Sequence, residues 1–157
     1  MLIYQKTLEH VTKGKIESYY DRHKDSFQTA LLAHIIVGDL SLAEELVDRA
    51  KSHPEQWAAL ALEHSLDLET ADTAGWLGLV RSSELQPEIS ELIFSAKAGD
   101  ILGPFKIQDR LEIILVHDVR TAQLDEKTRE RICEILFKEW LAELRKNVDL
   151  HWYWYQK

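Results

Sequence analysis

The side chain with the most unusual setting for acid–base chemistry is His34. It interrupts an otherwise apolar run from Thr29 to Gly38, where an imidazole would be shielded from water and still titrate near neutral pH. Such a group could hold or transfer a proton. The simpler interpretation is a core histidine whose ring nitrogens are satisfied by hydrogen bonds, so the residue alone leaves the role of His34 open.

A metal centre and thiol chemistry are not expected. Cys133 is the only cysteine, so it cannot form a disulfide within the chain, and it falls in a strongly helical stretch where a small buried thiol is the ordinary interpretation. The remaining histidines show no His-x-x-x-His or Cys pairing with the spacing of a metal site: His10, His23, His53, His64, His117 and His151. We therefore expect no metal and no cofactor.

Negative charge is concentrated in the middle of the chain. The net charge is −8, and residues 27–120 carry seven basic against sixteen acidic side chains. Neutralising phosphates requires clustered Lys and Arg, so neither nucleic acid nor an anionic membrane surface is an expected partner. No apolar run approaches the roughly 20 residues of a membrane-spanning helix, and residues 1–10 lack the apolar stretch of a signal peptide. As written, the sequence predicts a cytoplasmic protein, with a fragment of an exported protein as the alternative.

The elements that must position His34 follow from apolar spacing and turn residues. Helical spacing predicts helices over residues 2–24, with an interruption near Gly14, and over residues 87–96 and 124–146. It also predicts a helix with Ser41 as its N-cap. That helix ends at His53–Pro54, where the next helix begins. Strands are predicted over residues 29–38, 101–107, 110–119 and 148–155, and a surface loop over residues 65–79. This order predicts an α+β fold, a small antiparallel sheet of about four strands covered by helices, with helical segments at both ends.

Several short motifs in this order resemble the parvulin rotamase domain, over roughly residues 29–120. The matching segments are Ala33–Val37, Trp57–Leu62, His64–Asp67, Gly75–Gly78, Leu85–Ile89 with Leu92–Phe94, Ala98–Phe105 and Ile113–Ile114. Within residues 1–28 and 121–157, the stretches Ile16–Phe27 and Phe137–Leu144 are similar to the segments that flank this domain in bacterial foldases. The resemblance implies three parts: an N-terminal helical segment, a rotamase domain of the parvulin/FKBP-like type, and a C-terminal helix with an aromatic tail that packs with the first segment.

The resemblance also implies a catalytic group and a proline-binding pocket. By position, the catalytic group comprises His34, Asp67 and Glu112. The residues expected to bind proline are Leu77, Leu85, Ile89, Phe105 and Ile107. Without the resemblance, Asp67 could simply cap a loop and Glu112 could be a strand residue that points to solvent.

Three of these positions depart from the family pattern. Ile89 stands where the family usually has phenylalanine, Ile107 where it has a small polar residue, and Glu112 where it has a second histidine. Ile89 keeps the pocket apolar but removes the flat face against which a proline ring packs. Glu112 places a second carboxylate near Asp67 and His34, so either one carboxylate binds a proton or His34 becomes cationic between them.

These features leave three functions open. The first is a weak peptidyl-prolyl cis–trans isomerase that assists the folding or maturation of polypeptides, without phosphoserine specificity because the loop Gly38–Ser41 contains no basic residue. The second is a non-catalytic module that binds proline-containing or unfolded polypeptides. The third is a homodimer built through the terminal helices.

Overall fold

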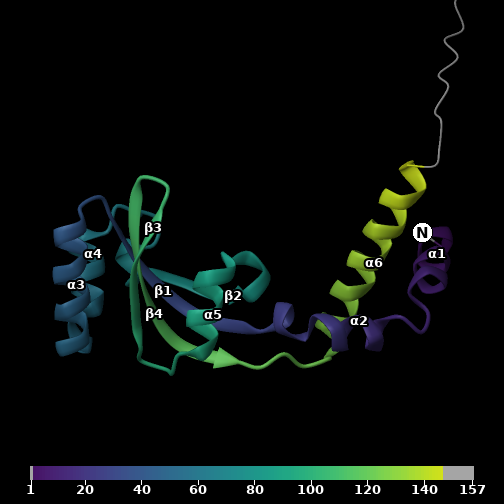
Figure 1. The fold of residues 1–157 in the computed structure, drawn as a ribbon, viewed down its shortest axis with the longest axis horizontal. Coiled ribbons are helices and arrows are strands. Elements are labelled where there is room, and N and C mark those ends of the chain that lie inside the picture. The colour runs from purple at the N-terminus through teal and green to yellow at the C-terminus, as the bar shows by residue number, and fades with distance from the viewer. Residues whose placement is uncertain (1, 147–157) are drawn as a thin grey trace, which may run out of the picture. The chain divides into compact units, whose positions relative to one another are not determined.

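The computed structural model describes residues 2–146 and divides into two compact units (Figure 1). The central unit comprises residues 24–122, and the other unit is made by the two ends of the chain, up to residue 23 and from residue 123. The predicted α+β class is confirmed. Among the described residues, no helix is both long and apolar enough to cross a lipid bilayer.

The central unit is built on a four-stranded antiparallel sheet in the order β2-β1-β4-β3 (Figure 1). Its strands are β1 (Thr29–Val37), β2 (Trp76–Arg81), β3 (Ile101–Ile107) and β4 (Arg110–Arg120). Strands β1 and β4 each have partners on both sides, so backbone hydrogen bonds fix them more fully than the edge strands β2 and β3. Residues on β1 are therefore well placed to hold a site in a fixed geometry.

The two faces of the sheet have separate apolar cores. Helices α3 (Leu40–Ser52) and α4 (Trp57–His64) cover one face, where Ala33, Ile35 and Val37 of β1 are buried. Helix α5 (Pro87–Ser95) covers the other face, where Ala30 and Leu32 are buried. Successive side chains of a strand point to opposite faces. His34 therefore points to the same face as Leu32, which is the α5 side.

The start of α3 differs from the prediction. The N-cap is Asp39, whose Oδ1 accepts a hydrogen bond from the Leu42 amide at 2.9 Å, and Ser41 is already inside the helix. Asp and Ser are equally good N-cap residues. The chain turns immediately after Gly38, so Asp39 reaches the capping position first. The Ser41 N-cap was therefore wrong by two residues.

The predicted loop over residues 65–79 is also wrong at its end. Residues 65–75 form a loop with a short 3₁₀ turn, η3 (Ala71–Thr73), but Trp76 begins strand β2, which pairs with β1. The pairing is interrupted by a register shift between Leu32 and Ala33, and Gly78 has a φ of +75°. These irregularities hide the alternation by which a strand is recognised. The predicted strand over residues 148–155 lies outside the described residues.

The other elements of the central unit agree with the prediction. Strands β3 and β4 are joined by the two-residue turn Gln108–Asp109, with Gln108 in the left-handed region at φ +55°. Short 3₁₀ helices complete the unit: η1 (Lys24–Phe27), η2 (Pro54–Gln56) and η4 (Ser82–Glu84).

The unit formed by the chain ends is helical. It contains α1 (Leu2–Thr12), α2 (Ile16–His23) and α6 (Glu126–Lys146), and α6 packs against both of the others. The break near Gly14 is confirmed, with Gly14 at φ +71°. An ion pair of 2.8 Å joins Arg129 of α6 to Glu17 of α2, which ties the C-terminal helix to the N-terminal segment.

Candidate active site

His34 lies between two carboxylates. Its Nδ1 is 2.6 Å from Glu112 Oε1, and its Nε2 is 2.8 Å from Asp67 Oδ2. Glu112 reaches His34 because β1 and β4 pair with Ile36 opposite Glu112 and Ile114 opposite His34. His34 and Glu112 are thus diagonal neighbours on one face of the sheet, within reach of long side chains. The structure brings together all three residues expected to form the catalytic group.

The loop that carries Asp67 is fixed to β1 by backbone hydrogen bonds. The Leu66 amide donates to the Ile36 carbonyl at 2.7 Å, and the His34 amide donates to the Gly75 carbonyl at 2.8 Å. Ser65 adds a third connection, since its Oγ accepts from the amides of Ile36 at 3.2 Å and Asp67 at 3.3 Å. The position of Asp67 relative to His34 is therefore determined by strand β1 itself.

Thr70 also belongs to this group, and the sequence did not single it out. Its Oγ1 donates to Asp67 Oδ2 at 2.7 Å and lies 3.3 Å from His34 Nε2. A hydroxyl three residues after an aspartate is a common local partner in turns. That spacing was the only signal available, and it does not distinguish a site residue from an ordinary turn residue.

The charges in this group stabilise a protonated imidazole. Burial of His34 acts to lower its pKa, but the hydrogen bonds to Glu112 and Asp67 and their negative charges outweigh this effect, so the pKa is raised above its ordinary value. The hydrogen bond from Thr70 and that from His34 lower the pKa of Asp67. A neutral imidazole has a single N–H, so only the cation can donate to both carboxylates. Of the two protonation patterns expected, the raised pKa of His34 and the lowered pKa of Asp67 favour a cationic His34.

Beside this group, α5 and the sheet enclose an apolar cluster. Ile89 is 7% exposed and packs there with buried Leu32, Ile93 and Ile114. Three more of the residues expected to bind proline pack against the same cluster: Leu85, Phe105 and Ile107. Leu77 does not join them, because it lies on β2 with 37% of its surface exposed.

Residues 2–146 contain no group of three or more His, Cys, Asp or Glu side chains arranged to hold a metal ion. The described residues place an apolar surface next to a charged, hydrogen-bonded group. Such a surface can bind a polypeptide segment and change the electrostatic environment of one of its amide bonds.

Comparison with known proteins places this arrangement in a family. A protein-family model described as Rotamase, a PPIC-type PPIASE domain, matches residues 40–118. The chain belongs to the PpiC-type peptidyl-prolyl isomerase family. The match covers Asp67, Glu112 and the cluster residues Ile89, Ile93 and Ile114, while Leu32 and His34 of β1 lie before its first residue.

Relatives of this PpiC-type chain include foldases. It is 38% identical over 116 residues to the foldase protein PrsA of Caldanaerobacter subterraneus subsp. tengcongensis, which covers 74% of this chain and 38% of that protein. It is 30% identical over 147 residues to the foldase protein PrsA of Halalkalibacterium halodurans, which covers 88% of this chain and 44% of that protein. The chain thus spans less than half the length of either relative.

Solved structures agree with the PpiC-type fold. The crystal structure of the peptidylprolyl isomerase PrsA of Bacillus cereus superposes with a TM-score of 0.63 at 22% identity, covering 92% of this chain and 59% of that one. A crystal structure of a PpiC-type peptidyl-prolyl cis–trans isomerase domain has a TM-score of 0.56 at 22% identity, covering 64% of this chain and 98% of that one. At this identity the likeness concerns the fold.

Proposed function

We propose that this protein is a parvulin-type peptidyl-prolyl cis–trans isomerase that assists the folding of proline-containing polypeptides. The observation that carries the proposal is the position of His34, which is held between Asp67 and Glu112 on the sheet face that also carries the apolar cluster. The proposed substrate is a polypeptide with an Xaa-Pro bond, whose proline ring packs against Leu85 and Ile89. Phe105 and Ile107 complete that surface, and Leu77 contacts the substrate from β2.

The apolar part of the proposed site acts on the charge distribution of the amide. Resonance creates a barrier of ~18–20 kcal/mol to rotation about the peptide bond. At the top of this barrier the amide is twisted and carries less charge separation than either planar form. A water-poor, apolar surface therefore binds the twisted form better than the planar form, and this difference lowers the barrier.

The charged part of the proposed site works in the same direction. With His34 protonated and both Asp67 and Glu112 ionised, the group has a net charge of −1. Negative potential near the substrate carbonyl disfavours the planar amide, whose oxygen carries more negative charge than in the twisted form. The group thus needs to supply neither a nucleophile nor a proton. It acts through its fixed position and its net negative charge.

We expect the activity to be weak. Ile89 provides apolar contact without the flat face that an aromatic ring offers to proline. The test is cis–trans exchange on short Xaa-Pro peptides, followed by NMR at several protein concentrations with His34→Ala as the control. Acceleration that rises with protein and disappears in a folded His34→Ala variant supports catalysis. No acceleration on any peptide by folded wild-type protein refutes it.

A second function, binding of polypeptide without catalysis, is favoured by exposed leucines in the loop of residues 65–75 that carries Asp67, which we call the site loop. Leu66 and Leu68 flank Asp67 in the sequence and are 51% and 83% exposed. Such side chains could contact apolar segments of an unfolded chain. Suppression of aggregation that persists in His34→Ala and Asp67→Ala but is lost in a Leu66→Ser/Leu68→Ser variant would support this function.

The roles of the flanking segments are part of the same proposal. Residues 29–120 would carry the isomerase site, and residues 1–28 and 121–157 would form a module that holds client polypeptide or joins two copies of the chain. A monomeric mass by light scattering would argue against the homodimer. The cytoplasmic location also stays a prediction.

A further inference from the structure

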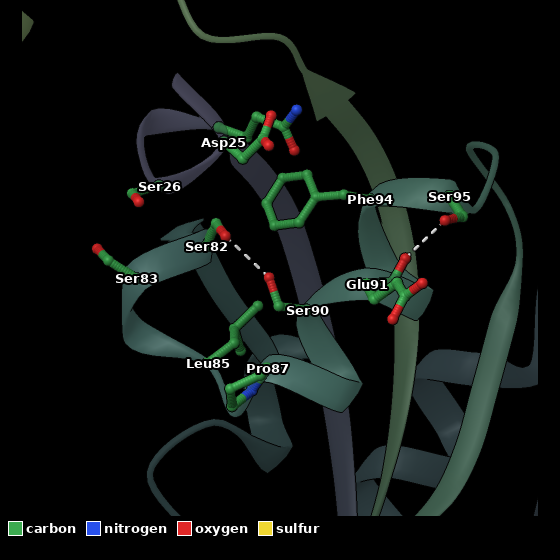
Figure 2. Close-up of a pocket in the computed structure, with 11 residues that line it drawn as sticks. Asp25, Ser26, Ser82, Ser83, Leu85, Pro87, Ser90, Glu91, Phe94 and Ser95 are labelled. Carbon is green, nitrogen blue, oxygen red and sulfur yellow. Dashed lines mark hydrogen bonds between the residues drawn. The ribbon is translucent and has the colours of Figure 1, made fainter. Parts of the chain in front are cut away.

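A pocket opens beside α5, apart from the His34 group. It has a volume of about 660 Å³ and is formed by η1, η4 and α5, all within the central unit (Figure 2). Five serines contribute to its lining, and two of them, Ser82 and Ser90, are joined by a hydrogen bond of 2.9 Å. The Phe94 ring projects from α5 toward the side of the pocket that carries Asp25 (Figure 2). The pocket therefore combines hydroxyl groups with one aromatic ring.

The charged groups in this pocket are all acidic. Asp25 and Glu91 line it, and no Lys, Arg or His is among its lining residues in the described part of the chain. Neither carboxylate forms an ion pair with another described residue. The two carboxylates attract a cation through their charge, and the face of the Phe94 ring, which projects toward the Asp25 side (Figure 2), can attract it as well. A guanidinium group also has several N–H donors that serine hydroxyls can accept.

The pocket continues into the apolar cluster that we propose binds proline. Leu85 and Phe94 line the pocket and also pack against that cluster. A polypeptide whose proline contacts Leu85 and Ile89 would place a neighbouring residue at the pocket, because an extended chain advances only ~3.3–3.6 Å per residue. The ligand of the pocket is thus expected to be part of the same polypeptide.

We propose that this pocket binds a basic side chain, Arg or Lys, that lies near the proline in the client polypeptide. This inference rests on the proposed function for the location of the proline. It makes the protein selective for basic clients, which agrees with the excess of acidic side chains over residues 27–120.

The test uses pairs of short acetylated peptides with a central Ala-Pro bond. One member carries Arg at a given flanking position and the other carries norleucine, and the position is moved along the peptide. Binding is measured by NMR titration of the full chain, and isomerisation is followed in the same samples. At one position we expect the Arg peptide to bind about fivefold more tightly, with shifts at the Ser90 and Glu91 amides and a preference that weakens as salt rises.

Variants then distinguish binding of Arg in the pocket from a general attraction between the acidic protein and a basic peptide. The Asp25→Asn/Glu91→Gln variant should remove most of the Arg preference and leave binding of the norleucine peptide unchanged. Glu88→Gln is the matched control, because Glu88 lies exposed on the same helix but does not line the pocket. Equal affinity for Arg and norleucine at every position overturns the proposal, as does a preference that survives the double variant. An Arg preference without isomerisation of any peptide would refute the catalytic function and support the pocket.

Discussion

The backbone of Gly75 lies directly against that of His34. The His34 amide donates to the Gly75 carbonyl at 2.8 Å, and a Cβ added to Gly75 would be 1.9 Å from the His34 carbonyl oxygen. Gly75 also has a φ of +72°, a conformation that is costly for residues with a side chain. This close approach sets the distance between the site loop and β1. The first glycine of the Gly75–Gly78 motif is therefore required by sterics at the candidate site.

Gly75→Ala should destabilise the central unit and displace the site loop. The strained backbone alone costs about 1–3 kcal/mol, and the clash with His34 adds to it. The measurement is the free energy of unfolding by denaturant, together with the NMR signals of the His34 ring. Gly99→Ala is the control, because Gly99 has a φ of +94° but open space around an added Cβ. Equal destabilisation by the two variants would show that the contact with His34 is unimportant.

Stability should depend on pH through His34 and Asp67. The pKa of His34 is raised in the folded state, so its stabilising contribution is complete below its ordinary pKa of about 6.5 and is lost as the pH rises through the folded value. The pKa of Asp67 is lowered, so its contribution is present above about 3.9 and is lost as the pH falls through the folded value. The combined contribution is largest between these limits.

The measurement is the free energy of unfolding as a function of pH. His34→Gln should flatten the profile above pH 6.5. An unaltered slope above pH 6.5 in folded His34→Gln would contradict the cationic state of His34.

Thr70→Val should raise the pKa of Asp67 and weaken the candidate site. The variant removes the hydroxyl that donates to Asp67 Oδ2 at 2.7 Å, and the loss of a hydrogen bond to a charged group costs about 1.5–3 kcal/mol. The carboxyl chemical shift of Asp67 followed over pH reports the change directly. Thr73→Val serves as the control, because the Thr73 hydroxyl donates to the Thr70 carbonyl and does not contact Asp67. A pKa of Asp67 that is equal in the two variants would remove Thr70 from the site.

Ile89→Phe should strengthen the binding of proline peptides. An aromatic face contributes about 0.5–1.5 kcal/mol beyond apolar burial, which corresponds to roughly a twofold to tenfold lower KM. Because Ile89 is almost fully buried, the larger ring also costs about 1–3 kcal/mol of stability. Ile89→Leu keeps the volume without adding a flat face and should leave KM unchanged. A folded Ile89→Phe variant with the KM of the wild type would argue that proline binds elsewhere.

The sequence was informative where local pattern and tertiary structure agree. The run around His34 is continuous and apolar because β1 is central and buried on both faces, and the helices appear clearly because each has one apolar stripe. Strand β2 was missed because it is an edge strand with exposed Trp76 and Leu79 and a register shift opposite Ala33. Edge strands lack the burial that produces a regular pattern.

The candidate site was predictable only in part, because its residues are brought together by tertiary structure. His34, Asp67 and Glu112 are far apart in the sequence, and their positions were proposed from the family motifs. His34 meets Glu112 through the register of β1 and β4, and it meets Asp67 through the hydrogen bonds that fix the Asp67 loop to β1. Neither arrangement can be read from the residues around one position. Thr70 and Ser65 act through single hydrogen bonds to a neighbouring residue or to the backbone. Polar residues in loops make many such bonds, so their types alone carry little information.

The loop that carries Asp67 has a second effect on the domain. Strand β2 pairs with β1 only from Thr29 to Ala33, and beyond that point the loop bonds to the same edge of β1 at His34 and Ile36. Without the loop, this part of the edge would offer free N–H and C=O groups to a strand from another molecule. Substitutions that loosen the loop should therefore promote aggregation of the protein itself as well as disturb the site.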